Sequence, residues 1–151
     1  SKNQLSSEIK SYIENDGTIL GICLGMQAFL NMSEESNSET LGLINGKVES
    51  LKKNFKLYMN VGFRELLLKN QNKTTNKLLN GINKTDKFYF LHKYHCKIDD
   101  NETNINFSYF ENKEIISLIN KKNLIGTQFH PELSGNPGLK FLENFSKLKI
   151  D

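Results

Sequence analysis

One cysteine in this chain lies where a catalytic nucleophile would be expected, at the end of an apolar run and between two glycines. In the segment Gly21-Ile22-Cys23-Leu24-Gly25, Cys23 comes directly after the run at 18–22 and directly before a helical pattern. This is the signature of a nucleophile elbow, with cysteine in place of serine. The flanking glycines leave room for a sharp strand-to-helix turn. We expect the helix that follows to point backbone N–H groups at the sulfur and to favour the thiolate.

A histidine and a carboxylate far downstream supply what an activated thiol needs. They lie in the segment Gln128-Phe129-His130-Pro131-Glu132. His130 can accept the thiol proton and return it to a leaving amine, while Glu132 can orient the ring and stabilise its charged form. Residues i and i+2 of an extended segment face the same way, so we expect Glu132 to reach the ring edge. With the backbone N–H of Leu24 as an oxyanion donor, these residues predict a cysteine hydrolase or acyl-transfer enzyme.

The same residue types also have structural interpretations. A buried cysteine usually only packs, and a histidine often only makes a structural hydrogen bond. We expect Cys96 to be a core residue, because it lies in an aromatic strand pattern without an elbow. His92 and His95 are expected to be structural or to line a substrate site. We expect no metal, since there is no CxxC motif and no third ligand for these two histidines.

Composition narrows the class of protein. The chain has 151 residues, of which 37% are hydrophobic and 25% charged, and these values predict one globular domain over 1–151. A net charge of +3 with scattered basic residues does not predict a nucleic-acid partner. Two cysteines, no apolar leader at the start of the sequence and no run of membrane-spanning length favour a reducing cytoplasm and no membrane.

Hydrophobic spacing predicts an α/β chain in which a helix, a strand, the elbow and a second helix follow one another. Asn70–Asn76 is expected to be a polar loop, and the last helix is expected to bury Leu139, Phe141, Leu142 and Phe145. The expected helices and helical turns lie at 5–13, 24–31, 78–82 and from 136 onward. The expected strands lie at 18–22, 43–51, 57–61, 65–69, 88–91, 94–98, 105–110, 115–119 and 124–129.

Several separated motifs, taken in order, resemble the class I glutamine amidotransferase family. Within it they are most similar to the glutaminase subunits of imidazole glycerol phosphate synthases. Besides the two segments above, the likeness is carried by 33–35, 41–44, 46–48, 60–63, 88–94, 138–140 and 144–145. The resemblance extends from about Leu5 to Phe145 and implies a flavodoxin-like open sheet flanked by helices.

The resemblance implies a catalytic triad of Cys23, His130 and Glu132 that hydrolyses glutamine through a thioester, without a cofactor. It implies that Gly25, Gln27 and Glu34 help to hold the glutamine. It places His92-Lys93-Tyr94 beside the α-amino and carboxylate groups of the substrate, mostly through backbone atoms. It further implies a heterodimer with a (β/α)₈-barrel synthase (cyclase) subunit, which uses the ammonia in a lyase step of histidine biosynthesis.

The sequence departs from that family in three places. Relatives carry additional N-terminal strands with a Pro-Gly loop that supplies a second oxyanion donor. We therefore expect this chain to lack those strands, either because it is N-terminally truncated or because a separate chain supplies them. Met59-Asn60, Val61 and Phe63 replace the usual Pro-His and Trp around Gly62, in a segment that faces the synthase in relatives. Lys93 replaces a small residue; it could pair with the glutamine carboxylate or point to solvent.

Alternative functions follow from these departures. The altered segment around Gly62 keeps open an ammonia-supplying subunit for a sugar amidotransferase of surface polysaccharide synthesis. A cysteine peptidase or chaperone-like protein would share the elbow but would not need Gln27 and Glu34. A non-catalytic binding module would keep the surface and lose turnover.

Overall fold

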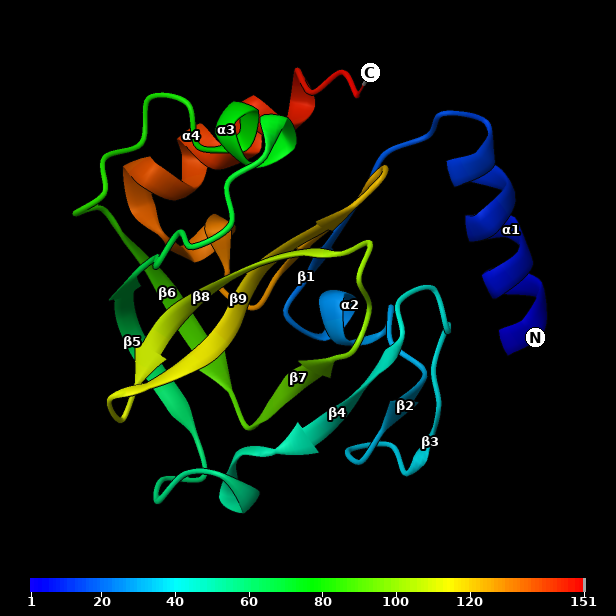
Figure 1. Ribbon diagram of the computed structural model, residues 1–151, viewed down its shortest axis with the longest axis horizontal. Helices are drawn as coiled ribbons and strands as arrows, with labels where there is room; N and C mark the ends of the chain where they lie inside the picture. The colour runs from blue at the N-terminus through cyan, green and yellow to red at the C-terminus, as the bar shows by residue number, and fades with distance from the viewer. Residues whose placement is uncertain (151) are drawn as a thin grey trace.

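The computed structural model describes residues 1–150 and is built from strands with a few short helices (Figure 1). The helices are α1 (Lys2–Glu14), α2 (Leu24–Gln27), α3 (Lys73–Leu78) and α4 (Gly135–Ser146), with 3-10 turns η1 (Leu51–Lys53) and η2 (Pro131–Leu133). The strands of the first half are β1 (Ile19–Ile22), β2 (Met32–Ser33), β3 (Ser38–Glu39), β4 (Gly46–Ser50) and β5 (Asn60–Glu65). Those of the second half are β6 (Lys87–His92), β7 (Tyr94–Ile98), β8 (Asn104–Phe110), β9 (Lys113–Lys121) and β10 (Leu124–Thr127).

The central sheet brings the two ends of the predicted site together. Its strand order is β1-β10-β9-β8, with β1 parallel to β10 and the other neighbours antiparallel. Ile22 is paired with Thr127, so the segment after β1 and the segment after β10 leave the same edge of the sheet. The cysteine segment and the histidine segment are therefore neighbours although about a hundred residues separate them.

Two smaller sheets complete the architecture. One has the order β3-β2-β4-β7, and the other is the antiparallel ribbon β5–β6. In Figure 1, α3 and α4 lie together on the β6 side of the molecule, whereas α1 stands at the opposite side. Leu5 and Tyr12 of α1 are exposed, so the apolar side chains of this helix are only partly covered.

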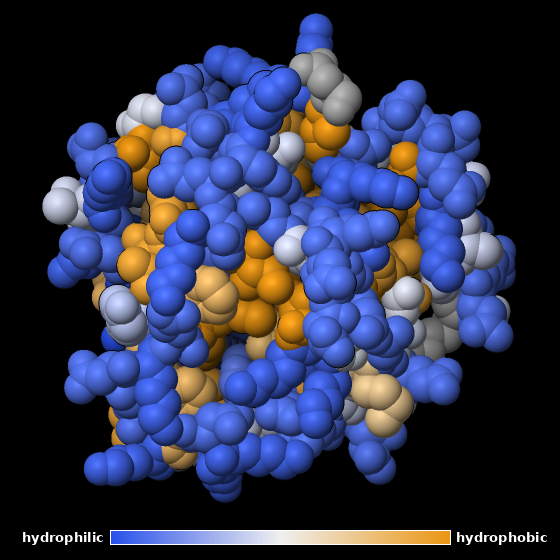
Figure 2. All heavy atoms as spheres, viewed as in Figure 1, coloured by the Kyte–Doolittle hydropathy of each residue, from blue (hydrophilic) through white to orange (hydrophobic). Residues whose placement is uncertain are grey.

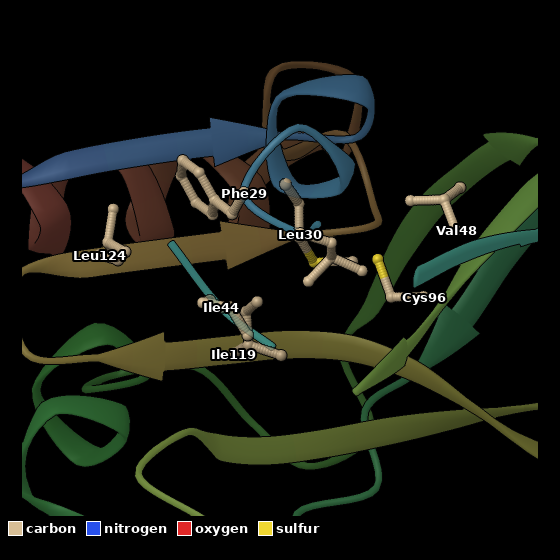
Figure 3. Packing of buried hydrophobic residues seen from close by; sticks show 8 residues of the cluster. Phe29, Leu30, Ile44, Val48, Cys96, Ile119 and Leu124 are labelled. Atoms are coloured by element: carbon tan, nitrogen blue, oxygen red, sulfur yellow. The ribbon is translucent and has the colours of Figure 1, made fainter. Parts of the chain in front are cut away.

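Three apolar clusters hold these layers together, and two of them surround the elements that carry the site; the third packs η1 against β8 and β9. The first joins β1 and α2 to β4, β7 and β9, and it includes Cys96 as the sequence predicted (Figure 3). The second is aromatic: Phe88 and Phe129 lie 4.5 Å apart between ring centroids, and Phe141 of α4 packs edge-on against both. Burying each such ring contributes roughly 1.5–3 kcal/mol, so this cluster fixes β6 against the segment that carries His130. Outside these clusters, the face in Figure 2 is largely hydrophilic, with hydrophobic atoms reaching the surface near its centre.

Several predicted element boundaries were wrong. The helix expected over 24–31 ends at Gln27. In place of the two strands expected at 57–61 and 65–69, a single strand, β5, spans the gap between them and passes through Gly62, and 57–59 and 66–69 lie outside it. The continuous register between β5 and β6 explains the second difference, because this long-range pairing overrides the local glycine signal. The polar segment 70–76, expected to be a loop, begins α3, because the Asn72 side chain accepts a bond from the N–H of Thr75 at 2.8 Å and caps it. In α4, Phe141 is buried as expected, but Leu139 is exposed.

No helix among residues 1–150 combines the length and the apolar character needed to cross a membrane.

Candidate active site

Cys23 occupies the sharp turn between β1 and α2. Its backbone has φ 53° and ψ −103°, a conformation that costs a non-glycine residue free energy and is concentrated at functional sites. The backbone N–H of Cys23 donates to the carbonyl of Thr127 at 2.6 Å, which ties the turn to the end of β10. The predicted elbow is therefore present, and the sheet itself holds it in place.

The sulfur of Cys23 has one donor and one acceptor contact. Its S–H donates to the carbonyl of Leu91 at 3.8 Å, and Nε2 of Gln128 donates to Sγ at 3.5 Å. These partners come from β6 and from the segment after β10. The thiol is thus held at a junction of three chain segments.

Burial raises the pKa of the Cys23 thiol above its ordinary value. The backbone N–H of Leu24 and the amide of Gln128 act in the opposite direction, while the carboxylates of Glu35 and Glu132 raise the pKa further. The N–H of Leu24 at the helix N-terminus thus favours the thiolate, as expected, but the cost of burial outweighs this contribution. The helix α2 has only four residues, and its effect is smaller than the cost of burial. A thiol held in this state needs a base when it reacts.

His130 is paired with Glu132, as the sequence predicted. Nδ1 of the ring contacts Oε1 of the carboxylate, which leaves Nε2 as the ring atom that can take a proton. The connecting residues form the 3-10 turn η2, so the expected extended segment was wrong, and the tight turn brings the side chains together instead. The side chain of Ser134 donates to the carbonyl of His130 at 2.6 Å and fixes the turn.

Cys23 and His130 each make a hydrogen bond to the backbone of strand β6. The sulfur lies against the carbonyl of Leu91, and the backbone N–H of His130 donates to the carbonyl of Tyr89 at 2.8 Å. Carbonyls two residues apart on one strand are separated by about 6.6 Å, so β6 holds the cysteine segment and the histidine segment near each other. Within the described part of the chain, the two hydrogen bonds of the sulfur go to Leu91 and Gln128, and neither goes to His130.

A hollow of about 380 Å³ opens beside the sulfur. Four of the predicted substrate-binding residues, Gln27, His92, Lys93 and Tyr94, line it together with Cys23 and Leu24. The remaining lining residues are Glu35, Met59 and Leu91. The hollow therefore combines a thiol, a cation, a carboxylate and backbone groups, which suits a small zwitterionic substrate.

The structure separates Glu34 from its neighbour Glu35. Glu34 pairs with Lys53 and accepts a bond from the N–H of Ser50 at 2.9 Å, and the bond with Lys53 is the main reason why its pKa is lowered. Glu35 instead lines the hollow. Glu35 could not be singled out from the sequence, because two adjacent glutamates give no signal of which one turns inward. Glu34 as a glutamine-binding residue remains a prediction that this arrangement does not favour.

The other expected residues take specific roles. Gln27 is buried rather than an exposed helix residue, and it donates to the carbonyl of Tyr94 at 2.9 Å. His92 is buried, which lowers its pKa to about 4 and keeps the ring neutral. The ammonium of Lys93 lies 5.8 Å from the ring centroid of Tyr58 at the rim of the hollow.

Across residues 1–150, no three His, Cys, Asp or Glu side chains gather into a metal-binding group.

The structure combines an open α/β sheet, a cysteine at a strained strand-to-helix turn and a histidine–carboxylate pair after the adjoining strand. This combination is typical of thiol-dependent acyl-transfer enzymes. The comparison with protein families then names the group: the class-I glutamine amidotransferase family matches residues 2–148. The chain belongs to this family. The open-sheet fold expected from the resemblance is confirmed.

Individual relatives agree with this assignment. The chain is 39% identical over 136 residues to the imidazole glycerol phosphate synthase subunit HisH of Pyrococcus furiosus, covering 89% of this chain and 67% of the relative. It is 36% identical over 141 residues to HisH 2 of Methanococcus maripaludis, covering 91% and 66%, and 38% identical over 149 residues to HisH of Caldanaerobacter subterraneus, covering 97% and 70%. The chain thus spans about two thirds of the length of the curated relatives it matches.

Solved structures share the fold. The crystal structure of a glutamine amidotransferase superposes with a TM-score of 0.60 at 16% identity, covering 93% of this chain and 68% of that one. A second glutamine amidotransferase, from Thermotoga maritima, superposes with a TM-score of 0.59 at 16% identity, covering 96% and 54%.

Proposed function

We propose that this chain is the glutaminase part of an imidazole glycerol phosphate synthase, and that it releases ammonia from glutamine for histidine biosynthesis. The observation that carries the proposal is the common attachment of Cys23 and the His130–Glu132 pair to β6, next to a hollow with complementary charges. The relatives named as HisH subunits support the particular acceptor reaction.

The proposed reaction has two halves. His130 takes the proton of Cys23, and the thiolate attacks the side-chain amide carbon of glutamine. The N–H of Leu24 donates to the oxyanion, and His130 returns the proton to the nitrogen, which leaves as ammonia with cleavage of the C–N bond. In the second half His130 activates a water that attacks the thioester, so that glutamate leaves and the thiol is restored. Glu132 stabilises the charged ring during both halves.

Substrate charge fits the groups around the hollow. The carboxylate of Glu35 suits the α-amino group of glutamine, and Lys93 with backbone atoms of 92–94 suits its α-carboxylate. Gln27 lines the hollow and is available to the side-chain amide of glutamine. Gly25 is not among the lining residues, so its contact with glutamine stays a prediction. We propose Glu35 rather than Glu34 for the amino group, since Glu34 is already paired with Lys53.

Ammonia must reach its acceptor unprotonated, and bulk water at neutral pH would protonate most of it. We therefore propose a heterodimer with a (β/α)₈-barrel subunit that receives the ammonia through a closed passage. The ribbon β5–β6 suits such a contact, because Val61, Phe63 and Leu91 expose 48%, 56% and 44% of their surface on one face beside Cys23. A reducing cytoplasm is part of this proposal, as it keeps the free thiol of Cys23 usable.

A glutamine analogue that carries an electrophile tests the nucleophile directly. We expect it to label Cys23 and to leave the buried Cys96 unlabelled, as read by mass spectrometry of the two peptides. Cys23→Ala should remove ammonia release from glutamine in the complex with the barrel subunit, and Cys96→Ala is the matched control. Full activity of Cys23→Ala in that complex would overturn the proposal.

A second acceptor is favoured by one observation, the replacement of the usual Pro-His and Trp by Met59-Asn60, Val61 and Phe63. Because this segment forms the exposed ribbon, a changed sequence there suits a changed partner. In that case the ammonia would serve a sugar amidotransferase of surface polysaccharide synthesis. Stimulation of ammonia release by the barrel subunit, or by the sugar-modifying enzyme, distinguishes the two.

A further inference from the structure

The sulfur of Cys23 is the end point of a buried series of side-chain amides. Gln128 donates from Nε2 to Sγ at 3.5 Å, and its Oε1 accepts from Nε2 of Gln27 at 3.1 Å. Nε2 of Gln27 also donates to the carbonyl of Tyr94 at 2.9 Å. Both glutamines are buried, with 0% and 4% of their surface exposed for Gln128 and Gln27. Gln128 therefore cannot exchange these partners for bulk water, and Gln27 meets the hollow with only a small part of its surface.

The direction of each bond in this series is fixed by the carbonyl of Tyr94. A carbonyl oxygen can only accept, so the amide nitrogen of Gln27, and not its oxygen, must face Tyr94. The second N–H of that nitrogen then faces Gln128, whose oxygen must accept it. The nitrogen of Gln128 is left facing the sulfur. A flipped Gln128 would place nitrogen against nitrogen at one end and oxygen against sulfur at the other.

A second branch reaches the same carbonyl from the ribbon. Nδ1 of His92 donates to the carbonyl of Tyr94 at 2.8 Å, so the ring proton is on Nδ1 and Nε2 accepts from Nδ2 of Asn60 at 3.0 Å. Oδ1 of Asn60 in turn accepts from Nε of Arg64 at 2.6 Å, and arginine is only a donor. The branch begins with an obligatory donor and ends on an obligatory acceptor, so it has one consistent assignment.

The two contacts of the sulfur respond differently to loss of its proton. The thiol donates to the carbonyl of Leu91, and the thiolate has no proton to donate there. The amide of Gln128 can donate to both forms and donates more strongly to the anion. We propose that Gln128 is a catalytic residue that holds Sγ of Cys23 and stabilises its thiolate, and that Gln27 and the carbonyl of Tyr94 position the Gln128 amide for this task. The catalytic part of this inference rests on the proposed function, in which Cys23 is the nucleophile.

The pH dependence of Cys23 alkylation by iodoacetamide tests the inference without glutamine or a partner. Gln128→Met keeps the length of the side chain and removes the donor, so we expect the alkylation midpoint to rise by about half a unit to one unit. Asn106→Leu is the matched control, because Asn106 is a fully buried amide on β8 whose bonds go to Asn70 and Asn104. The control should lose stability without moving the midpoint. A wild-type midpoint in Gln128→Met would overturn the proposal.

Two further variants keep the test decisive. If Gln128→Met does not fold, Gln128→Asn keeps an amide but is one methylene too short to reach the sulfur, and it should raise the midpoint similarly. Gln27→Met should raise it as well, because Gln128 is then free to turn; an unchanged midpoint would overturn the positioning role. The other charged or titratable groups around the sulfur are unaltered in these variants: Glu35, Glu132, His92, Lys93, Cys96 and the proposed base His130.

Failure of this inference and failure of the proposed function give different results. A midpoint that rises in Gln128→Met while the wild type releases no ammonia in any complex would support the role of Gln128 at the sulfur and contradict the glutaminase. Ammonia release that depends on Cys23, together with an unchanged midpoint in Gln128→Met, would contradict only the role of Gln128.

Discussion

Gly21 and Gly25 approach each other so closely that a Cβ atom on Gly21 would lie 2.7 Å from both the carbonyl carbon and the carbonyl oxygen of Gly25. A Cβ atom on Gly25 would meet nothing within 4 Å. The two glycines of the elbow thus serve different purposes. The first allows α2 to pack on β1, and the second leaves open space on the side of α2 that bears it.

We predict that Gly21→Ala destabilises the protein by about 1–3 kcal/mol, because a backbone contact cannot relax as a flexible side chain can. Gly25→Ala should leave the free energy of unfolding unchanged or raise it by up to about 1 kcal/mol, since alanine is the better helix residue. Urea unfolding of both variants measures the difference. Equal losses of stability would show that the elbow is not packed as described.

This difference could not be read from the sequence, although the elbow itself could. The strand, the turn and the start of α2 follow from local signals: an apolar run, two glycines and helical spacing. Which of the two glycines lies close to the neighbouring backbone depends on how α2 packs on β1. Likewise, the pairing of β5 through Gly62 is set by β6, about thirty residues away.

In the candidate active site, too, some contacts could be predicted from the sequence and others could not. His130 and Glu132 are neighbours in sequence, so their pairing could be predicted even though the backbone between them was not. The bond from Gln128 to the sulfur, and the turn that brings Glu35 rather than Glu34 to the hollow, depend on segments that meet only in the folded chain. Residue type alone carries no information about them.

For glutamine binding we predict opposite behaviour of the two adjacent glutamates. Glu35→Gln should raise KM for glutamine by roughly 10-fold or more with a smaller change in kcat, because a charged hydrogen bond to the α-amino group is worth about 1.5–3 kcal/mol. Glu34→Gln should leave KM unchanged, since its carboxylate is engaged by Lys53. Steady-state ammonia release in the proposed complex with a barrel subunit measures both. The reverse pattern would place the amino group at Glu34.

The resting thiol of Cys23 should titrate above the ordinary range for cysteine, because burial raises its pKa and two carboxylates add to the effect. Alkylation at neutral pH should accordingly be slow and should accelerate with rising pH. Glu35→Gln removes one of the two negative charges, so we predict that it lowers the alkylation midpoint, whereas Glu34→Gln should not. A wild-type midpoint below the ordinary range would show that the helix N-terminus outweighs burial after all.

Acid should destabilise the fold through its buried histidines. Burial lowers the pKa of His92 and of His95 to about 4, whereas an unfolded histidine titrates near about 6.5. Above that value both states are neutral and the histidines contribute no pH dependence. As the pH falls below about 6.5, the histidines of the unfolded state bind protons and those of the folded state do not. The free energy of unfolding therefore decreases progressively between about pH 6.5 and pH 4, by up to roughly 3 kcal/mol per histidine.

His95→Gln isolates this effect away from the sulfur. The ring of His95 contacts Oδ1 of Asn54 through Nε2 at 3.1 Å, and a glutamine amide can donate to the same oxygen without titrating. Urea unfolding at pH 7 and at pH 5 should show a smaller loss of stability on acidification in His95→Gln than in the wild type, by about 2 kcal/mol. Equal losses of stability in the two proteins would mean that His95 is protonated in the folded state at pH 5. The His95 ring would then be less well shielded from water than its packing against Phe55 indicates, with the two ring centroids 5.6 Å apart.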